Sequence, residues 1–457
     1  MRFDIAIIGC GASGAVLATQ LFRQAAGAIS VCCVEPATRL GAGLAYGRCG
    51  EEHLLNVPAS RISAIAGEDF DFVEWLTSRG LLQGDPSAFY APRCRYADYL
   101  TDSLGRSLRN SSHRHLIDHQ PSRAVGMEPD GGGWRLRLAS GERIETNAAV
   151  LALGNLRAPD PPTGLEALAE DSRYLHDPWQ LANRKLRRDR AVAIIGSGLT
   201  AVDVLQTLMH RGHRGAIEVV SRSGSWPSEH LRTRGAYAVR WPEGSLRQLL
   251  RELHRHLDAD EAVDWRDVID SVRPHTQRLW QGLSDADKRR FRTRLAGRWG
   301  RARHRMPPEI GKALRQWQRE GRFRLHAAGQ LRAERGESEI HLFLTDGGAP
   351  LKVRRVINAT GPLLDLRRSD DRLLSGLLAD GRVRPGALGA GLDADGDGRL
   401  INRAGQVWPG LFALGPLLAG NLLESTAMPE IKIQAFHLAA TLLGDARAVA
   451  EIRTKTG

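Results

Sequence analysis

Two glycine-rich turns constrain the fold of this chain more than any other feature of its sequence. Each lies between a short apolar strand and a helical stretch. The first is DIAIIGCGASGAV, with Gly9, Gly11 and Gly14, and the second is AVAIIGSGLTAVD, with Gly196, Gly198 and Ala201. In such a turn the first small residue permits a tight bend, the second lets backbone approach a pyrophosphate, and the third lets the helix pack closely on the strand. The repetition predicts two nucleotide sites, each at a helix N-terminus.

The strand that follows each turn ends differently. ISVCCVE ends in Glu35, which is placed to accept hydrogen bonds from a ribose, whereas AIEVVSRS ends in Ser221 and Arg222. An arginine at this place accommodates a 2′-phosphate, which favours NADPH in the second site. The same arginine can equally stack on adenine, so NADH stays open as the nucleotide.

The charge of the chain is basic, with 64 lysines and arginines against 52 acids and a net charge of +12. A clustered basic face would indicate nucleic acid. Here the arginines are scattered, with the densest runs at 184–190 and 287–305. We therefore expect no nucleic-acid partner. The positive electrostatic potential of the chain would equally attract anionic cofactors and an anionic small substrate.

Neither the cysteines nor the acids predict a metal site. The five cysteines form no CxxC pair, and Cys32 and Cys33 lie in an apolar run expected to be a buried strand. The segment 393–404 begins like a calcium loop, but its twelfth position is Ala404 instead of glutamate. A hairpin turn is the better interpretation of this segment.

The order of segments predicts an α/β fold with two Rossmann-like, three-layer dinucleotide-binding domains. Two segments are expected to be strands that end in small residues, at sites where the chain can cross between domains. They are TNAAVLALGN (146–155) and RRVINATGP (354–362). The expected division is a discontinuous first domain of 1–170 and 355–457, and a second domain of 171–354. Helical periodicity predicts a helical insertion at about 245–320, and the last helix begins at about Pro429. With no long apolar run and no signal-peptide pattern, we expect a cytoplasmic protein without a membrane partner.

The arrangement of these motifs resembles flavoproteins with two dinucleotide-binding domains. Five further stretches resemble one subgroup of these proteins. They are LGAGLAYG (40–47), HLLNVPASRIS (53–63), FYAPRCRYADYL (89–100), RHRMP (303–307) and LLESTAMPEIKIQA (422–435). That subgroup is related to amine N-hydroxylating monooxygenases and includes bacterial FAD-dependent urate hydroxylases. The resemblance implies FAD in the first site and NADH or NADPH in the second.

The implied reaction is hydroxylation of a small electron-rich substrate by dioxygen through a flavin hydroperoxide. The preferred substrate, implied by the resemblance, is urate, which would be converted to 5-hydroxyisourate in purine catabolism. An anionic heterocycle of this kind also suits a basic site. N-hydroxylation of an amine or amino acid is the alternative. An NAD(P)H oxidase or flavin reductase, and a nucleotide-sensing binding protein without turnover, also stay open, since a fold does not decide function.

The resemblance also places further residues at FAD. They lie on the loop after Glu35 (Gly43, Tyr46 and Asn56), at two glycine turns (Gly361 and Gly415), and around the start of the last helix (Thr426 and Glu430). Capping of that helix is an equally good role for Thr426. The common Gly-Asp pair of the superfamily is Gly415-Pro416 here, so an aspartate contact to the ribityl chain is lacking.

No catalytic residue is identified from the sequence, and only candidates for substrate or nicotinamide contact emerge. Arg303, His304 and Arg305 form the densest cationic cluster, which predicts an anion site or, alternatively, a solvated face. His53 is a candidate proton relay or simply a hydrogen-bonding residue.

Overall fold

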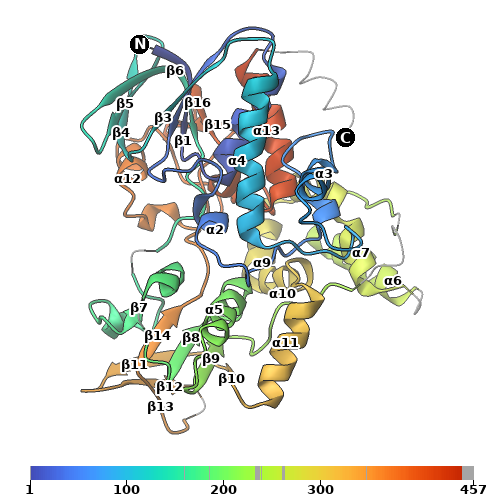
Figure 1. Ribbon diagram of the computed structural model, residues 1–457, viewed down its shortest axis with the longest axis vertical. Coiled ribbons are helices and arrows are strands. Elements are labelled where there is room, and N and C mark those ends of the chain that lie inside the picture. Colours follow the sequence, from blue (N-terminus) through green and yellow to red (C-terminus); the bar gives the residue numbers. More distant parts are fainter. Residues whose placement is uncertain are drawn as a thin grey trace.

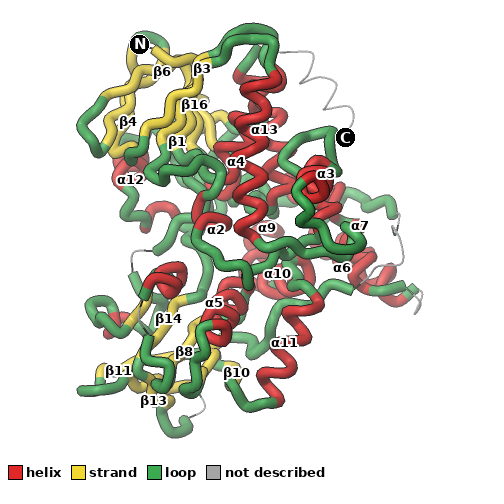
Figure 2. Tube along the Cα trace, viewed as in Figure 1, coloured by secondary structure: helices red, strands yellow, loops and turns green. Residues whose placement is uncertain are grey.

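The computed structural model describes residues 2–158, 160–184, 186–231, 237, 239–259, 263–345 and 347–444. It is a mixed α/β structure with two separate sheets whose central strands are parallel (Figure 1). Strands and helices follow one another in the order expected for two dinucleotide-binding units. In the view of Figure 2 the strands gather at two places, with helices beside both. Among the described helices, none is long and apolar enough to cross a bilayer.

The first sheet has the order β15-β16-β6-β1-β2-β3, and a β4-β5 hairpin extends from β6. Its central pairs, β16 with β6, β6 with β1, β1 with β2 and β2 with β3, are all parallel. The strands are β1 (Arg2–Ile8), β2 (Ser30–Val34), β3 (Leu116–Gln120), β4 (Ala124–Asp130), β5 (Gly133–Leu138), β6 (Arg143–Leu151), β15 (Arg399–Ile401) and β16 (Val407–Ala413).

The two faces of this sheet are covered by different elements because alternate residues of a strand point to opposite faces. Ile5 and Ile7 of β1 lie in a core with residues of four helices, whereas Ala6 and Ile8 pack with the β4-β5 hairpin and one further helix. The helices of this unit are α1 (Ala12–Gln24), α2 (Gly43–Gly47), α3 (Asp71–Ser78), α4 (Arg93–Asn110), α12 (Arg372–Ala379) and α13 (Met428–Leu442). On the first face α1 packs against both α4 and α13, and on the second α12 packs against β4.

The second sheet is wholly parallel, with the order β10-β9-β8-β14-β7. Its strands are β7 (Tyr174–Leu175), β8 (Val192–Ile195), β9 (Ile217–Ser221), β10 (Arg324–Ala327) and β14 (Arg355–Asn358). One face packs on α5 (Leu199–His210) and α11 (Pro308–Arg319). The other packs on a small antiparallel sheet of β11 (Leu331–Arg335), β12 (Ile340–Leu344) and β13 (Leu351–Val353).

The helical periodicity at 245–320 is confirmed, since this segment contains helices and short turns. They are α6 (Leu246–Asp258), α7 (Trp265–Ser271), α8 (Thr276–Gly282), α9 (Asp285–Arg294), α10 (Ala296–Arg303) and α11. Short 3-10 turns occur here and elsewhere, at Ala59–Arg61, Glu166–Leu168, Pro178–Asn183, Arg273–His275, Leu366–Arg368 and Gly415–Leu418. In Figure 1, α6, α7, α9 and α10 lie on the right of the two sheets, below α13 and α4.

Residue 355, where the sequence places the return of the chain to the first domain, lies in a strand of the second sheet. Residue 355 begins β14, and β14 pairs with β8 and β7 of the second sheet. We therefore propose that the second unit extends through Asn358 and that the chain returns to the first unit after this strand. The rest of the division, 1–170 with the C-terminal part and 171 onward, stays our proposal.

Candidate functional site

The residues of the first glycine turn have almost no room for side chains. Gly9 has φ +89°, and a Cβ built there would lie 2.5 Å from the Ala152 carbonyl oxygen. A Cβ on Gly14 would lie 2.3 Å from the Gly9 carbonyl oxygen. Gly11 and Gly43 touch in the same way, since a Cβ on Gly11 would lie 3.0 Å from the Gly43 Cα. The loop bearing Gly43 thus lies directly on the turn.

The second turn repeats this geometry in the second sheet. Gly196 has φ +115°, and its Cβ would lie 2.3 Å from the carbonyl oxygen of Ala359. Ala201 is fully buried against the sheet. Gly198 differs, because a Cβ there would meet no atom within 4 Å. The chain itself therefore does not explain why position 198 lacks a side chain, whereas the close approach of a nucleotide backbone would.

Both helices that follow the turns begin with unpaired backbone donors. The N-cap residues are Gly11 for α1 and Gly198 for α5; neither has a side chain to cap its helix, and neither helix has an acid in its first turn. In α5 the Ala201 N–H donates to the Gly198 carbonyl oxygen at 2.9 Å, and the N–H groups before it, like those at the start of α1, can bind an anion together with the helix dipole. These two helix starts fit the pyrophosphates of two dinucleotides, which is the chemistry expected of FAD and NAD(P)H.

The residues at the ends of the next strands lie where the sequence predicts. Glu35 directly follows β2, and its Oε1 accepts a hydrogen bond from the Ala37 N–H at 3.0 Å. Ser221 ends β9, and its hydroxyl accepts a hydrogen bond from the Ser197 hydroxyl at 2.9 Å, inside the second glycine turn. Arg222 is exposed. Its guanidinium is thus accessible to an adenosine phosphate, and its role stays a prediction.

The two crossing segments lie side by side. The Leu363 N–H donates to the Leu156 carbonyl oxygen at 2.8 Å, which joins the segment after β14 to the segment after β6. Gly361, with φ +97° and open space around it, lies between this bond and the Ala359 carbonyl that contacts Gly196. Gly361 therefore follows the strand whose end contacts the second turn, and its contact with FAD stays a prediction.

The loop after Glu35 brings two further candidates to the same region. Tyr46 lies in α2, which packs on α4, and its ring centroid is 5.1 Å from that of Tyr96. Burial raises the pKa of Tyr46 to about 12, so its hydroxyl stays protonated. The Asn56 carbonyl oxygen accepts a hydrogen bond from His230 Nε2 at 2.9 Å. This bond ties the loop to the second unit, and flavin contact by Tyr46 and Asn56 stays a prediction.

His230 makes this junction sensitive to acid. Burial lowers its pKa to about 4, against an ordinary value near 6.5, and the nearby Arg305 adds to this effect. The unfolded chain therefore binds an extra proton between these values. We expect stability to be complete above pH 6.5 and to fall by roughly 2–3 kcal/mol as the pH drops to 4.

Urea titrations at several pH values measure this dependence. His230→Gln keeps a donor for the Asn56 carbonyl and should flatten the curve between pH 6.5 and 4. His254→Gln, at an exposed position of α6, is the control and should leave it unchanged. An equal pH dependence in all three proteins would show that His230 does not cause it.

The C-terminal loop runs from Gly415 to the start of α13. The Gly415 N–H donates to Gln434 Oε1 at 3.2 Å, and a Cβ on Gly415 would lie 3.0 Å from the Ser13 hydroxyl in the first turn of α1. Thr426 is exposed and does not cap α13, because the N-cap is Ala427 without a side-chain bond. The loop thus returns to the first nucleotide turn, and the capping alternative for Thr426 is wrong.

Glu430 is committed to an ion pair. Its carboxylate accepts hydrogen bonds from Arg273 Nε at 2.8 Å and Arg273 Nη2 at 3.1 Å. Arg303 Nη2 lies 3.9 Å away. Glu430 thereby links the start of α13 to the helical insertion, and in this arrangement its oxygens are occupied by protein donors.

The cluster of Arg303, His304 and Arg305 is neither a solvated face nor a group of free cations. The Arg305 side chain is buried, with Nη1 bonded to Asp270 Oδ2 at 3.0 Å. Arg303 Nε lies 3.1 Å from Glu424 Oε1, and both side chains are buried. Burial lowers the pKa of His304, which favours its neutral form. Because carboxylates already neutralise both arginines, the structure does not favour the anion site predicted from the sequence.

His53 is a hydrogen-bonding residue at the junction of the two units. Its Nδ1 accepts from the Gly50 N–H at 3.1 Å, so Nε2 carries the proton and donates to the Thr207 hydroxyl at 2.9 Å and the Asp203 carbonyl at 3.1 Å. With both nitrogens engaged in a buried site, the geometry favours the hydrogen-bonding alternative over a proton relay.

A buried ion pair beside His53 was not predicted from the sequence. Arg93 Nη1 lies 2.5 Å from Asp203 Oδ2, and Arg93 Nε donates to the Leu54 carbonyl oxygen at 3.0 Å. Burial disfavours the charged guanidinium, but Asp203 more than compensates and holds the pKa of Arg93 above its usual value. The available signal was Asp203 itself, a charged residue among the apolar positions of α5. This pair fixes the second nucleotide-binding helix to α4 of the first unit.

The remaining expectations concern cysteines and metal. Cys32 and Cys33 are buried in β2, as predicted. Cys33 Sγ lies 3.3 Å from Cys10 Sγ, and their hydrogen bond and burial raise the pKa of Cys10 well above its usual value, so the Cys10 thiol stays protonated. In the segment 393–404, Asp395 Oδ1 accepts hydrogen bonds from the N–H groups of Asp397 and Arg399, and the chain then enters the β15-β16 hairpin. The hairpin interpretation is confirmed.

Comparison with known proteins agrees with this geometry. Residues 6–156 match a protein family described as FAD-NAD(P)-binding. The matched segment is the N-terminal part of the chain. It contains the first glycine turn, Glu35, the loop with Gly43, Tyr46 and Asn56, and the segment after β6 that leads towards the second unit.

One curated relative and two solved structures extend the comparison. The L-ornithine N(5)-monooxygenase of Burkholderia cepacia is 27% identical over 243 residues, which are 49% of this chain and 52% of the relative. The chain thus matches about half the length of that protein. The ornithine hydroxylase of Pseudomonas aeruginosa superposes with a TM-score of 0.64 at 19% identity, over 97% of this chain and 99% of the other. The FAD-bound cadaverine monooxygenase of Erwinia amylovora gives 0.65 at 16% identity, over 98% and 96%. These structures establish a shared fold along nearly the whole chain.

Proposed function

We propose that this protein is an FAD-dependent NAD(P)H monooxygenase that N-hydroxylates an amine. The observation that carries the proposal is the junction of the two glycine turns. The segments after β6 and β14 are hydrogen-bonded to each other, and each presents a carbonyl oxygen to the first glycine of one turn. Two dinucleotides held at α1 and α5 would therefore extend towards the same junction, as transfer of electrons from one to the other requires.

The roles of the chain's own residues follow from this placement. The free N–H groups of α1 and α5 bind the two pyrophosphates, and Glu35 accepts hydrogen bonds from the first ribose. FAD, when bound, supplies the redox chemistry and the activation of dioxygen. The helical insertion is joined to the start of α13 by the Arg273–Glu430 ion pair and to the C-terminal loop by the bonds between Gln277 and Leu423. We assign to it the exclusion of water from the reacting groups.

The choice of an amine comes from the relatives. The Burkholderia protein is named for ornithine and the Erwinia structure for cadaverine, and both names describe monooxygenases. In the corresponding reaction one oxygen atom of dioxygen goes to the amine nitrogen and the other leaves as water, while NAD(P)H supplies two electrons. Urate, which we expected from the sequence, finds no support in these comparisons, and the buried pairing of Arg303 and Arg305 with acids removes the basic site that favoured it.

The test is oxidation of NADH and NADPH in air by the FAD-loaded protein, with L-ornithine, L-lysine, cadaverine, hexylamine or urate added separately. Acceleration by an amine, with a hydroxylamine formed in proportion to the nucleotide consumed, is the expected result. Nucleotide oxidation that no compound accelerates and that yields only hydrogen peroxide would make the protein an oxidase and contradict the proposal.

The nucleotide preference rests on Arg222. Because this arginine is exposed directly after Ser221, we expect NADPH to be preferred and Arg222→Glu to raise the KM for NADPH by about tenfold or more, since an acid repels the 2′-phosphate. Steady-state kinetics with both nucleotides measure the change, and Arg214→Glu, on the turn that precedes β9, is the control. An unaltered ratio of the two KM values would assign Arg222 no part in the choice.

A further inference from the structure

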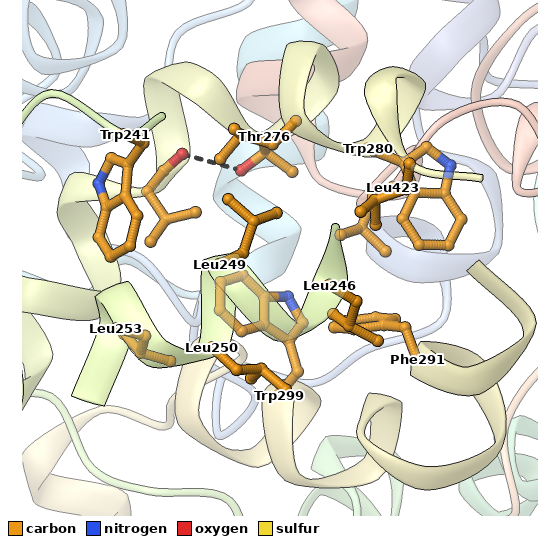
Figure 3. A pocket seen from close by; sticks show the side chains of 13 residues that line it. Trp241, Leu246, Leu249, Leu250, Leu253, Thr276, Trp280, Phe291, Trp299 and Leu423 are labelled. Atoms are coloured by element: carbon orange, nitrogen blue, oxygen red, sulfur yellow. Dashed lines mark hydrogen bonds between the residues drawn. The ribbon is translucent and has the colours of Figure 1, made fainter. Parts of the chain in front are cut away.

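An apolar pocket lies inside the helical insertion. It has a volume of about 90 Å³ and is lined by α6, α8, α9, α10 and the C-terminal loop. Figure 3 shows Leu249, Trp299 and Leu246 between the indole of Trp241 on one side and that of Trp280 on the other. The Thr276 hydroxyl, one of the few polar groups in the lining, already donates to the Val272 carbonyl oxygen at 3.2 Å. The lining therefore offers a ligand apolar contact and almost no hydrogen bonds.

A buried carboxylate is joined to two residues of the pocket lining. Glu424 follows the lining residue Leu423, and its Oε1 accepts a hydrogen bond from the Nε1–H of Trp299, which also lines the pocket. Glu424 Oε2 is buried and has no hydrogen-bond partner. Arg303, on the Oε1 side, leaves Oε2 unbonded. A buried acceptor without a donor is costly, and a ligand that brings an N–H group removes this cost.

The backbone at Glu424 is strained. Its φ is +60°, and among the described residues it is the only one other than glycine with a positive φ. Such a conformation persists where the surroundings enforce it, and it is typical of functional sites. Leu423 is held by a pair of bonds with Gln277: its N–H donates to Gln277 Oε1 at 3.2 Å, and its carbonyl oxygen accepts from Gln277 Nε2. The insertion thus holds Leu423 at the pocket lining, next to the strained residue Glu424.

The pocket is also close to the first nucleotide turn. Ser425, the next residue, is buried, and its carbonyl oxygen lies 3.8 Å from the position of a Cβ on Gly415. Gly415 in turn contacts Ser13 at the start of α1. The loop residues that follow Glu424 therefore run back to the glycine turn that begins the proposed FAD site.

We propose that this pocket binds the apolar body of the substrate and that Glu424 Oε2 accepts a hydrogen bond from its amino group. This inference rests on the proposed function and narrows it: the substrate is a primary amine with an alkyl chain or a single ring, and with no second charged group. A zwitterionic amino acid or a diamine would have to place a charge among leucines and tryptophans, which is unfavourable.

The matched probes are hexylamine and cadaverine, which have similar lengths but differ in the second amino group. Isothermal titration calorimetry with the FAD-loaded protein, without nicotinamide nucleotide, measures their binding independently of turnover. We expect hexylamine to bind at least tenfold more tightly than cadaverine. Hexan-1-ol, which has the chain but no charged head, should bind more weakly than hexylamine.

Two variants test the two halves of the site. Leu249→Trp fills the pocket and should abolish hexylamine binding. Glu424→Gln keeps an acceptor for Trp299 and should weaken hexylamine by fivefold or more while leaving hexan-1-ol unchanged. Glu252→Gln, on the same insertion in α6 but outside the pocket lining, is the control and should bind both as the parent does.

Equal affinity for hexylamine and cadaverine, or hexylamine binding that neither variant alters, would overturn the inference. Failure of the proposed function looks different: hexylamine would bind and respond to both variants, yet no hydroxylamine would form when NADPH and dioxygen are supplied. Flavin absorbance, recorded for each variant, shows whether the protein has kept its cofactor and hence its fold.

Discussion

A Gly198→Val protein should fold and bind FAD normally but lose reduction by NAD(P)H. Position 198 is the N-cap of α5, with φ −78° and ψ −174°, an extended conformation that valine adopts without strain. The structure offers open space to its side chain, so the change in unfolding free energy should stay within about 1 kcal/mol. The new side chain instead occupies the space where the nucleotide backbone approaches the helix. We expect the KM for NAD(P)H to rise on the order of 100-fold, which corresponds to about 2.7 kcal/mol of binding.

The matched comparison is Gly196→Val, two residues earlier in the same turn. Gly196 has φ +115°, and its side chain would meet the Ala359 carbonyl oxygen at 2.3 Å. This variant should lose about 3 kcal/mol or more of stability, because strain and overlap add. Urea unfolding separates the two variants, and stopped-flow reduction of the flavin measures the loss of function. A Gly198→Val protein that is reduced at the parent rate would place the nucleotide elsewhere.

The difference between these two glycines shows where sequence patterns reach their limit. The motif predicts both turns, the parallel strands around them and the helices that follow, because strand, turn and helix are encoded locally. It does not predict which atoms each glycine contacts. Ala152 and Ala359, whose carbonyl oxygens contact the first glycine of each turn, come from strands about 140 to 160 residues away. Only the pairing of β6 with β1 and of β14 with β8 brings them there.

The charged residues illustrate the same limit. A run such as Arg303, His304 and Arg305 predicts a positive surface only if its side chains lack partners. The acids that neutralise the arginines, Asp270 and Glu424, lie at quite different places in the sequence. Local composition cannot reveal such pairs, because each depends on how the insertion packs against the loop before α13. For the same reason the pocket lined by Trp241, Trp280 and Trp299 is invisible in the helical periodicity of the insertion.

The pair of Arg93 and Asp203 should be the most costly to break. The side chains are 13% and 6% exposed, so removing one partner leaves the other charged and buried without compensation. We expect Arg93→Met to lower the free energy of unfolding by about 3–5 kcal/mol. Arg39→Met is the control, because the Arg39–Asp98 pair has a similar distance, 2.7 Å, but side chains 43% and 37% exposed. It should cost about 1 kcal/mol or less.

The double variant Arg93→Met/Asp203→Leu separates the cost of a lone charge from the value of the pair. Two apolar side chains leave no unpaired charge, so most of the lost stability should return. The link between α4 and α5 would nevertheless lose its fixed geometry, since the directional Arg93–Asp203 contact is gone. We therefore expect the double variant to unfold at nearly the parent urea concentration while flavin reduction by NAD(P)H is slowed. If it recovers both stability and rate, the pair serves stability alone, and other contacts at the junction, such as that of His53 with Thr207, must orient the two units.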